Sequence, residues 1–158
     1  VAGTVLEQTV LAANGSRTNS YTDKDANGAE LEKIVVTTSA NGLSRTLERT
    51  GTFGGLTDLR SSVTDATVLN ADGSRGRTIA ASDQGGTYKA RRIVTSRDDG
   101  LSQTSKLDLD DNGTFEVIGT NVTRLDGGSL DTLVFNNANG TLRQKSVVSV
   151  GGALDGET

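Results

Sequence analysis

The stretch IVVTTSANGLS, from Ile34 to Ser44, contains the two signals that decide how this chain folds. Its first half is apolar and rich in β-branched residues, which favour pleated, half-buried strands. Its second half contains Asn41-Gly42, and Asn-Gly is the strongest short signal for a β-hairpin. We expect a type I′ turn here, because Asn and Gly tolerate the positive φ that both of its central residues need. Strands joined by such turns must be antiparallel.

The same turn signal recurs along the whole chain. The sequence contains 20 Gly, and most of them follow Asn, Asp or another Gly. The spacing leaves roughly nine residues for a strand between turns. No window shows a sustained helical period with caps, so we expect an all-β antiparallel meander. The ten predicted turns are Asn14-Gly15, Asn27-Gly28, Asn41-Gly42, Asp72-Gly73, Gly85-Gly86, Asp99-Gly100, Asn112-Gly113, Gly127-Gly128, Asn139-Gly140 and Gly151-Gly152.

A longer period is superimposed on the spacing of the turns. Gly15 and Gly73 are 58 residues apart, and so are Gly42 and Gly100. The neighbouring residues agree as well, since Asn-Gly-Leu-Ser at 41–44 matches Asp-Gly-Leu-Ser at 99–102. Self-similarity at a fixed period is typical of repeat proteins. We therefore expect residues 1–158 to form a single array of four-stranded modules, with module 1 at about 11–68, module 2 at about 69–124 and a partial module 3 at about 125–158.

Three tertiary arrangements could bury the apolar side chains of such a meander. It could coil into a spiral or solenoid, fold over as a two-sheet sandwich, or form propeller blades, although fewer than three modules cannot close a ring. We expect an elongated, coiled, solenoid-like or sandwich arrangement, in which apolar doublets such as Val35-Val36 are buried on both faces. The partial module, and a start at Val1 without any Met, predict a processed chain or a fragment of a larger repeat protein.

The composition excludes several classes of function. There is no His and no Cys, so Ser-His-Asp triads, thiol nucleophiles, disulfides and Cys/His zinc sites are impossible, and we expect no enzymatic activity. The net charge is −4 and the basic residues are scattered, which argues against nucleic-acid binding. The densest basic run, Lys89–Arg92, reads as solvated strand positions. No apolar stretch approaches the roughly 20 residues that span a bilayer, and no signal peptide is visible.

One segment carries a pattern that is typical of a metal site. Residues 108–116 read DLDDNGTFE, an Asp-x-Asp-x-Asn-Gly-x-x-Glu pattern. Alternate side chains in a tight loop can point at one centre, and Ca²⁺ takes about six to eight oxygen ligands in irregular geometry. The twelfth position is Gly119 rather than Glu, so the loop is not an EF-hand. The predicted calcium ligands are Asp108, Asp110, Asn112, the backbone carbonyl of Thr114, and Glu116.

A second, weaker match lies in the first module. Asp23, Asp25 and Asn27 repeat the first three ligand positions, but the ninth position is Leu31. Turns also recruit Asp, Asn and Gly for backbone reasons alone, so an ordinary acidic turn is the alternative at both places. Mg²⁺ fits less well than Ca²⁺, because it demands near-octahedral geometry and retains its water.

The recurring elements resemble a known group of proteins. Asp/Asn-Gly-Ser, Asp/Asn-Gly-Leu-Ser-x-Thr and Asp-Leu-Asp-Asp-Asn-Gly-Thr-Phe-Glu are similar to the repeat regions of large secreted bacterial exoproteins of the RTX, or haemolysin-type calcium-binding, group. The tandem Gly-Gly-x-Gly-x-Asp nonapeptides of that group are absent, so its parallel β-roll is not implied. A looser similarity is to RHS/YD-type repeats, whose meanders wind into a spiral sheet. The resemblance implies export to the cell surface or medium, where calcium is available.

Two functional hypotheses follow. The first is a structural β-repeat segment of a secreted or cell-surface protein, serving as a spacer, adhesin stalk or filament subunit, with calcium stabilising some turns. Its expected partners are neighbouring repeats or copies of itself, because open strand edges favour head-to-tail assembly. The second is a calcium-dependent module that binds a surface glycan or a protein. A concave site beside residues 108–116 would favour the second hypothesis.

Overall fold

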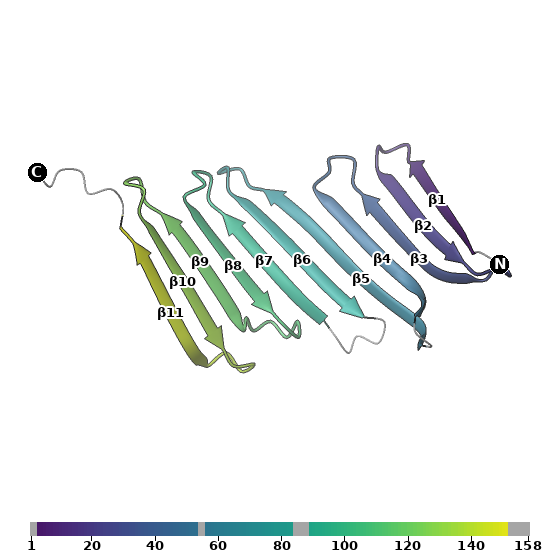
Figure 1. Cartoon of the computed structure of the whole chain (residues 1–158). Helices are drawn as coiled ribbons and strands as arrows, with labels where there is room; N and C mark the ends of the chain where they lie inside the picture. The colour runs from purple at the N-terminus through teal and green to yellow at the C-terminus, as the bar shows by residue number, and fades with distance from the viewer. Residues whose placement is uncertain (1–2, 54–55, 84–88, 152–158) are drawn as a thin grey trace, which may run out of the picture. The chain divides into compact units, whose positions relative to one another are not determined.

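In the computed structural model, the chain forms a meander of antiparallel strands (Figure 1). The structure describes residues 3–53, 56–83 and 89–151, and only the backbone of residues 52–53 and 56–60. Its strands follow one another in chain order within one 11-stranded sheet, so the predicted all-β antiparallel meander is confirmed. Their bounds are β1 Thr4–Leu11, β2 Arg17–Lys24, β3 Glu30–Thr38, β4 Ser44–Phe53, β5 Leu56–Leu69, β6 Arg75–Asp83, β7 Lys89–Ser96, β8 Ser102–Asp108, β9 Val117–Thr123, β10 Ser129–Asn136 and β11 Leu142–Val150.

The hairpin turns use glycines with a positive φ, but they are not type I′ turns. Between β1 and β2, the N–H of Ala12 donates to the carbonyl of Ser16, and the N–H of Gly15 donates to the carbonyl of Ala12. Gly15 has a φ of 83°, and Asp111 is the only non-glycine residue with a positive φ in the described ranges. The expected type I′ geometry is therefore wrong. Each such loop is a type I turn followed by a left-handed glycine, which forms a G1 bulge.

The side chain before each of these glycines explains why Asn or Asp is used. Asn14 accepts a hydrogen bond from the backbone N–H of Ser16 at 3.0 Å, and Asp72 accepts one from Ser74 at 2.9 Å. These contacts hold the turn in shape without help from the rest of the sheet. The predicted turns at Gly85-Gly86 and Gly151-Gly152 lie wholly or partly outside the described residues.

A second loop class recurs at the spacing of the predicted module. The N–H of Ser39 donates to the carbonyl of Ser44, and the N–H of Arg97 donates to the carbonyl of Ser102. Each pair encloses four residues, one more than in the first loop class. The two loops are 58 residues apart in the sequence. The 58-residue module as a structural unit stays a prediction, as does its coiling into a solenoid or sandwich.

The chain divides into two compact units. The first contains Val1–Ala66 and Ile79–Lys89, and the second contains Thr67–Thr78 and Ala90–Thr158. Within the second unit, four threonines lie side by side across β7 to β10, in the order Thr95, Thr104, Thr120 and Thr132. Such cross-strand pairs each contribute roughly 0.2–1 kcal/mol.

The described residues contain no buried hydrophobic side chain in either unit. Val35 and Val36 are half-buried, so the predicted burial of this doublet on both faces is wrong. The accessible surface is 10,779 Å², whereas a globular chain of this mass exposes about 7,500 Å². Among the described residues, no helix offers the length and apolar character that crossing a bilayer requires. In its described part, the sheet is therefore stabilised by its hydrogen-bond ladder and by cross-strand pairs rather than by buried apolar side chains.

Candidate metal centre

The segment with the predicted calcium pattern joins β8 to β9. β8 ends at Asp108 and β9 begins at Val117, so this connection is longer than the hairpin turns. Two residues within it are left-handed, Asp111 with a φ of 55° and Gly113 with a φ of 93°. Asp tolerates this conformation better than most side chains, and Gly adopts it without steric cost. These two residues fold the loop back over the end of β8.

Asp108 is the centre of this loop and is fully buried, with 0% of its surface exposed. Its Oδ1 accepts a hydrogen bond from the N–H of Asn112 at 3.1 Å. Its Oδ2 accepts one from the N–H of Gly113 at 2.9 Å and one from Nη2 of Arg91 at 3.1 Å. A carboxylate oxygen offers about two lone pairs, so the two donors at Oδ2 saturate it.

The surroundings of Asp108 keep it ionised. Burial by itself raises the pKa of this carboxyl group, because it removes the charge from water. Hydrogen bonds from the N–H of Gly113, the Arg91 guanidinium and the N–H groups of Asn112 and Asp110 outweigh burial, so the pKa lies below its ordinary value. The loop therefore contains a buried negative charge at neutral pH.

Two further carboxylates lie beside Asp108. Single carboxylate oxygens of Asp108, Asp110 and Glu116 all lie within 4.8 Å of one another. Oδ2 of Asp110 accepts a hydrogen bond from Nδ2 of Asn112 at 2.9 Å, and Oε2 of Glu116 accepts one from the N–H of Leu109 at 2.8 Å. The other oxygen of Glu116, Oε1, is buried and has no hydrogen-bond partner. A buried acceptor without a donor is costly, so Oε1 is the atom in this loop that a cation would most stabilise.

The charges around the loop do not balance. Arg91 forms ion pairs with Asp108 and with Asp111, the latter at 3.3 Å from Nε to Oδ1. Among the described residues, no ion pair involves Asp110 or Glu116. Arg91 therefore pairs with two of the four carboxylates of the loop, and a divalent cation between Asp108, Asp110 and Glu116 would reduce their mutual repulsion.

The residues present fit a hard, oxygen-binding cation. Of the five predicted ligands, the structure brings the side chains of Asp108, Asp110 and Glu116 together. Oδ1 of Asn112 accepts the N–H of Thr114 at 2.7 Å, so this amide oxygen already has one partner. The roles of Asn112 and of the Thr114 carbonyl as ligands stay predictions. Carboxylate oxygens in an irregular loop are the ligand set that Ca²⁺ accepts.

The second predicted loop has a different local structure. Asp23 lies within β2, opposite Val5 and Glu32 on the neighbouring strands. Oδ1 of Asp25 accepts hydrogen bonds from the N–H groups of Asn27 and Ala29, each at 2.8 Å. Asp25 thus closes the turn between β2 and β3 by itself. Calcium binding by Asp23, Asp25 and Asn27 stays a prediction.

Arg91 is the functional residue that the sequence pattern does not reveal. Within the run 89–92 the sequence predicts only solvated positions, whereas Arg91 is half-buried and lies directly opposite Asp108 in the β7–β8 ladder. Its guanidinium carbon lies 5.9 Å from the ring centroid of Phe115, and Nζ of Lys106 lies 5.4 Å from the same centroid. The turn of a hairpin fixes which residues of its two strands lie opposite each other. The predicted turn at 99–102 therefore carries the signal that places Arg91 opposite Asp108.

Comparison with known proteins adds no assignment: no protein-family model, no curated protein and no solved structure matches this chain.

Proposed function

We propose that this chain is a non-catalytic structural β-repeat segment of a secreted or cell-surface bacterial protein, serving as a spacer, adhesin stalk or filament subunit. The observation that carries this proposal is the absence of any buried hydrophobic side chain among the described residues. Each described strand is stabilised mainly by its neighbouring strands, one for β1 and β11 and two for the others, so further strands can be added without rebuilding a core. An array of this kind can vary in length, which suits a spacer or stalk.

The chemistry of the side chains supports a non-catalytic role. His and Cys are absent from the sequence. Asp72 and Asp108 each have a displaced pKa, and in both the pKa is lowered. For Asp72 the causes are hydrogen bonds from the side chain and backbone of Ser74. A general acid needs a raised pKa near the working pH, so both shifts favour structural hydrogen bonding instead.

We further propose that calcium stabilises the loop at 108–116. Oε1 of Glu116 has no protein partner, and each oxygen of Asp110 accepts one hydrogen bond, from Asn112. Water would complete a coordination sphere of about six to eight oxygens. The expected effect is local, because binding would hold the end of β8 and the start of β9 together.

A calcium titration of the purified chain tests this proposal. Thermal unfolding is followed by circular dichroism in EDTA and then in rising CaCl₂. Binding to the folded state alone stabilises it by about 2.7 kcal/mol when the free ion is 100 times Kd, so the midpoint should rise and keep rising with concentration. Asp110→Asn should abolish the rise.

Asp111→Asn provides the matched control. It removes one negative charge from the same loop, and Asn also tolerates the left-handed φ of this position. Its carboxylate faces Arg91 and is not one of the three clustered groups, so the calcium effect should persist. An equal loss of the calcium effect in both variants would mean that the ion is attracted by net charge alone. If CaCl₂ does not raise the unfolding midpoint of the wild-type chain, the loop at 108–116 is an ordinary acidic turn.

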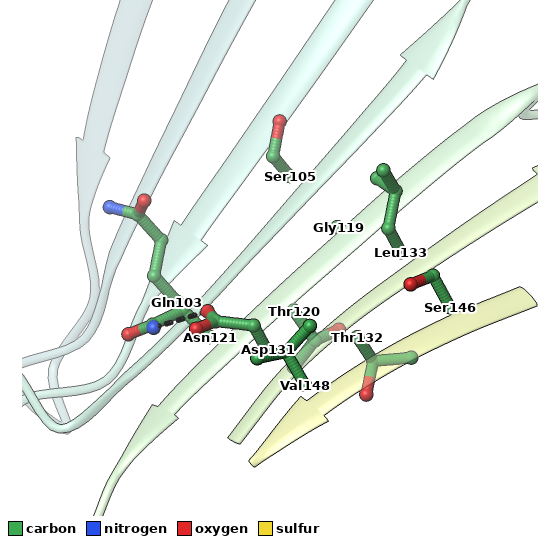
Figure 2. A pocket seen from close by; sticks show the side chains of 10 residues that line it. All are labelled: Gln103, Ser105, Gly119, Thr120, Asn121, Asp131, Thr132, Leu133, Ser146 and Val148. Atoms are coloured by element: carbon green, nitrogen blue, oxygen red, sulfur yellow. Dashed lines mark hydrogen bonds between the residues drawn. The ribbon is translucent and has the colours of Figure 1, made fainter. Parts of the chain in front are cut away.

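The calcium-dependent glycan- or protein-binding module stays a prediction, and one observation favours a calcium-independent form of it. A hollow of about 410 Å³ lies over β8 to β11, where Gly119 lacks a side chain between Ser105 and Leu133. Figure 2 shows the side chains that line it. Nδ2 of Asn121 donates to Oδ1 of Asp131 at 2.6 Å beside it. None of residues 108–116 lines this hollow, so such binding would not need calcium. Gly119→Leu should fill the hollow and so remove any glycan binding that the wild-type chain shows on a glycan array. If the variant binds as well as the wild type, this hollow is not the binding site.

A further inference from the structure

The first and last described strands present their outer edges without a partner strand in the described part of the chain. β1 pairs only with β2, and β11 pairs only with β10. Every residue of both strands is exposed, whereas the inner strands β2 and β3 each also contain half-buried residues. Their large apolar side chains are between 49% and 73% exposed, namely Val5, Leu6, Val10 and Leu11 on β1 and Leu142, Val147, Val148 and Val150 on β11. Exposed, apolar strand edges are templates for pairing with another chain.

The two edges carry opposite charges. Glu7 is the only charged residue of β1, whereas β11 contains Arg143 and Lys145 and no acidic residue. Lysine on an edge strand usually discourages pairing, and here it opposes pairing between two copies of β11. The same cations attract an edge with a carboxylate. Charge therefore favours contact between unlike edges over contact between like edges.

We propose that β11 of one chain pairs antiparallel with β1 of a second copy, in the register that places Lys145 opposite Glu7. This register also places Val147 opposite Val5, and Gln144 opposite Gln8. The ladder of β11 is regular from Gln144 to Val150, because its bulge lies at the other end, opposite Phe135 and Asn136. The added strand therefore meets a regular edge.

Pairing between unlike edges has a structural consequence. The contact is heterologous, because it uses β11 of one chain and β1 of the next, and such a contact can repeat from copy to copy and gives a filament where the rotation between copies does not close. This inference rests on the proposed structural role and names its partner as a second copy of this chain. It does not involve the calcium loop, and its test is made in EDTA so that the two proposals can fail separately.

The test is a charge reversal measured by sedimentation velocity at low ionic strength, with the full chain. The wild type is expected to associate in a concentration-dependent way, and added salt should weaken association because it screens the exposed pair. Glu7→Lys and Lys145→Glu should each weaken association by about tenfold, since an attractive cross-strand pair becomes repulsive. An equimolar mixture of the two variants should restore association, because each Lys then meets a Glu. Glu48→Lys and Lys89→Glu, exposed positions on inner strands, make the same charge changes and should have no effect.

Several results would overturn the proposal. A wild-type chain that stays monomeric at the highest soluble concentration would refute it. Association that survives both reversals would assign the contact to a sheet face. If Glu7→Lys abolishes association but Lys145→Glu leaves it unchanged, the contact does not involve β11. It would then lie between two β1 edges, or between β1 and another part of the second chain. Circular dichroism of each variant shows that it is folded, and the mixture tests the pairing even if each variant alone is less stable.

Discussion

Replacement of Asp108 by Asn is expected to lower the free energy of unfolding by about 3 kcal/mol, because it removes a buried charge from its partners. The amide retains one oxygen, but it cannot accept from Asn112, Gly113 and Arg91 together. The Arg91 guanidinium would then lose its buried partner while still lying against Phe115. Urea unfolding at pH 7, in EDTA, measures the loss. Asp72→Asn is the control, since Asp72 is an exposed turn residue and should change stability little.

The pH dependence of stability in the wild type and in Asp108→Asn gives an independent check on the buried charge of Asp108. The pKa of Asp108 is lower in the folded chain than its ordinary value of 3.8. Its contribution to stability is therefore fully present above the unfolded pKa and is lost as the pH falls through the lowered, folded pKa. Wild type should lose stability below about pH 4, and Asp108→Asn should lose less over that range. Parallel acid-unfolding curves for the two proteins would show that Asp108 is not the buried charge described above.

Gly51→Ala is expected to destabilise the sheet by about 2 kcal/mol or more, because a Cβ has no room there. An added Cβ would lie 2.5 Å from the carbonyl oxygen of Leu31 and 2.9 Å from Cα of Glu32. Both obstacles are backbone atoms of β3, so β3 and β4 would have to separate. Equilibrium denaturation measures the change.

Gly76→Ala is the matched control for that substitution. Gly76 also lies within a strand, its φ is not positive, and an added Cβ would have no atom within 4 Å. The substitution should be neutral or stabilise by up to about 1 kcal/mol, because Ala has less backbone freedom to lose on folding. Equal effects at the two positions would contradict the β3–β4 pairing at Gly51.

The arrangement of strands could be predicted because each turn is a local event. Asn14-Gly15 and its counterparts fix a loop through contacts within five residues, so the pattern of turns predicts the meander directly. The turn type could not be predicted, because Asn-Gly suits a type I′ turn as well as a type I turn with a G1 bulge. The choice depends on strand twist and on the Asn14 hydrogen bond to Ser16.

Burial and the loop at 108–116 show where local signals are insufficient. The Val35-Val36 doublet predicts burial on both faces, but burial needs a second layer, and no local signal reports whether one exists. The clustering of the loop's three carboxylates could be predicted from their spacing in the sequence. The contact of Arg91 with Asp108 could not, because Arg91 lies on another strand, 17 residues away in the sequence. A contact between strands depends on register, which two-sided polar strands specify only weakly.

The heat capacity change of unfolding tests the central claim, that this sheet folds without a hydrophobic core. It would be measured by differential scanning calorimetry in EDTA, at a concentration where the chain is monomeric. A globular chain of this length unfolds with a heat capacity change of about 2 kcal/mol/K, because unfolding exposes buried apolar surface. A sheet whose apolar side chains stay partly exposed should give a smaller value, about 1.6 kcal/mol/K if the change scales with the surface buried on folding. A value of about 2 kcal/mol/K or more would show that the apolar faces are covered in solution, and would contradict a coreless sheet.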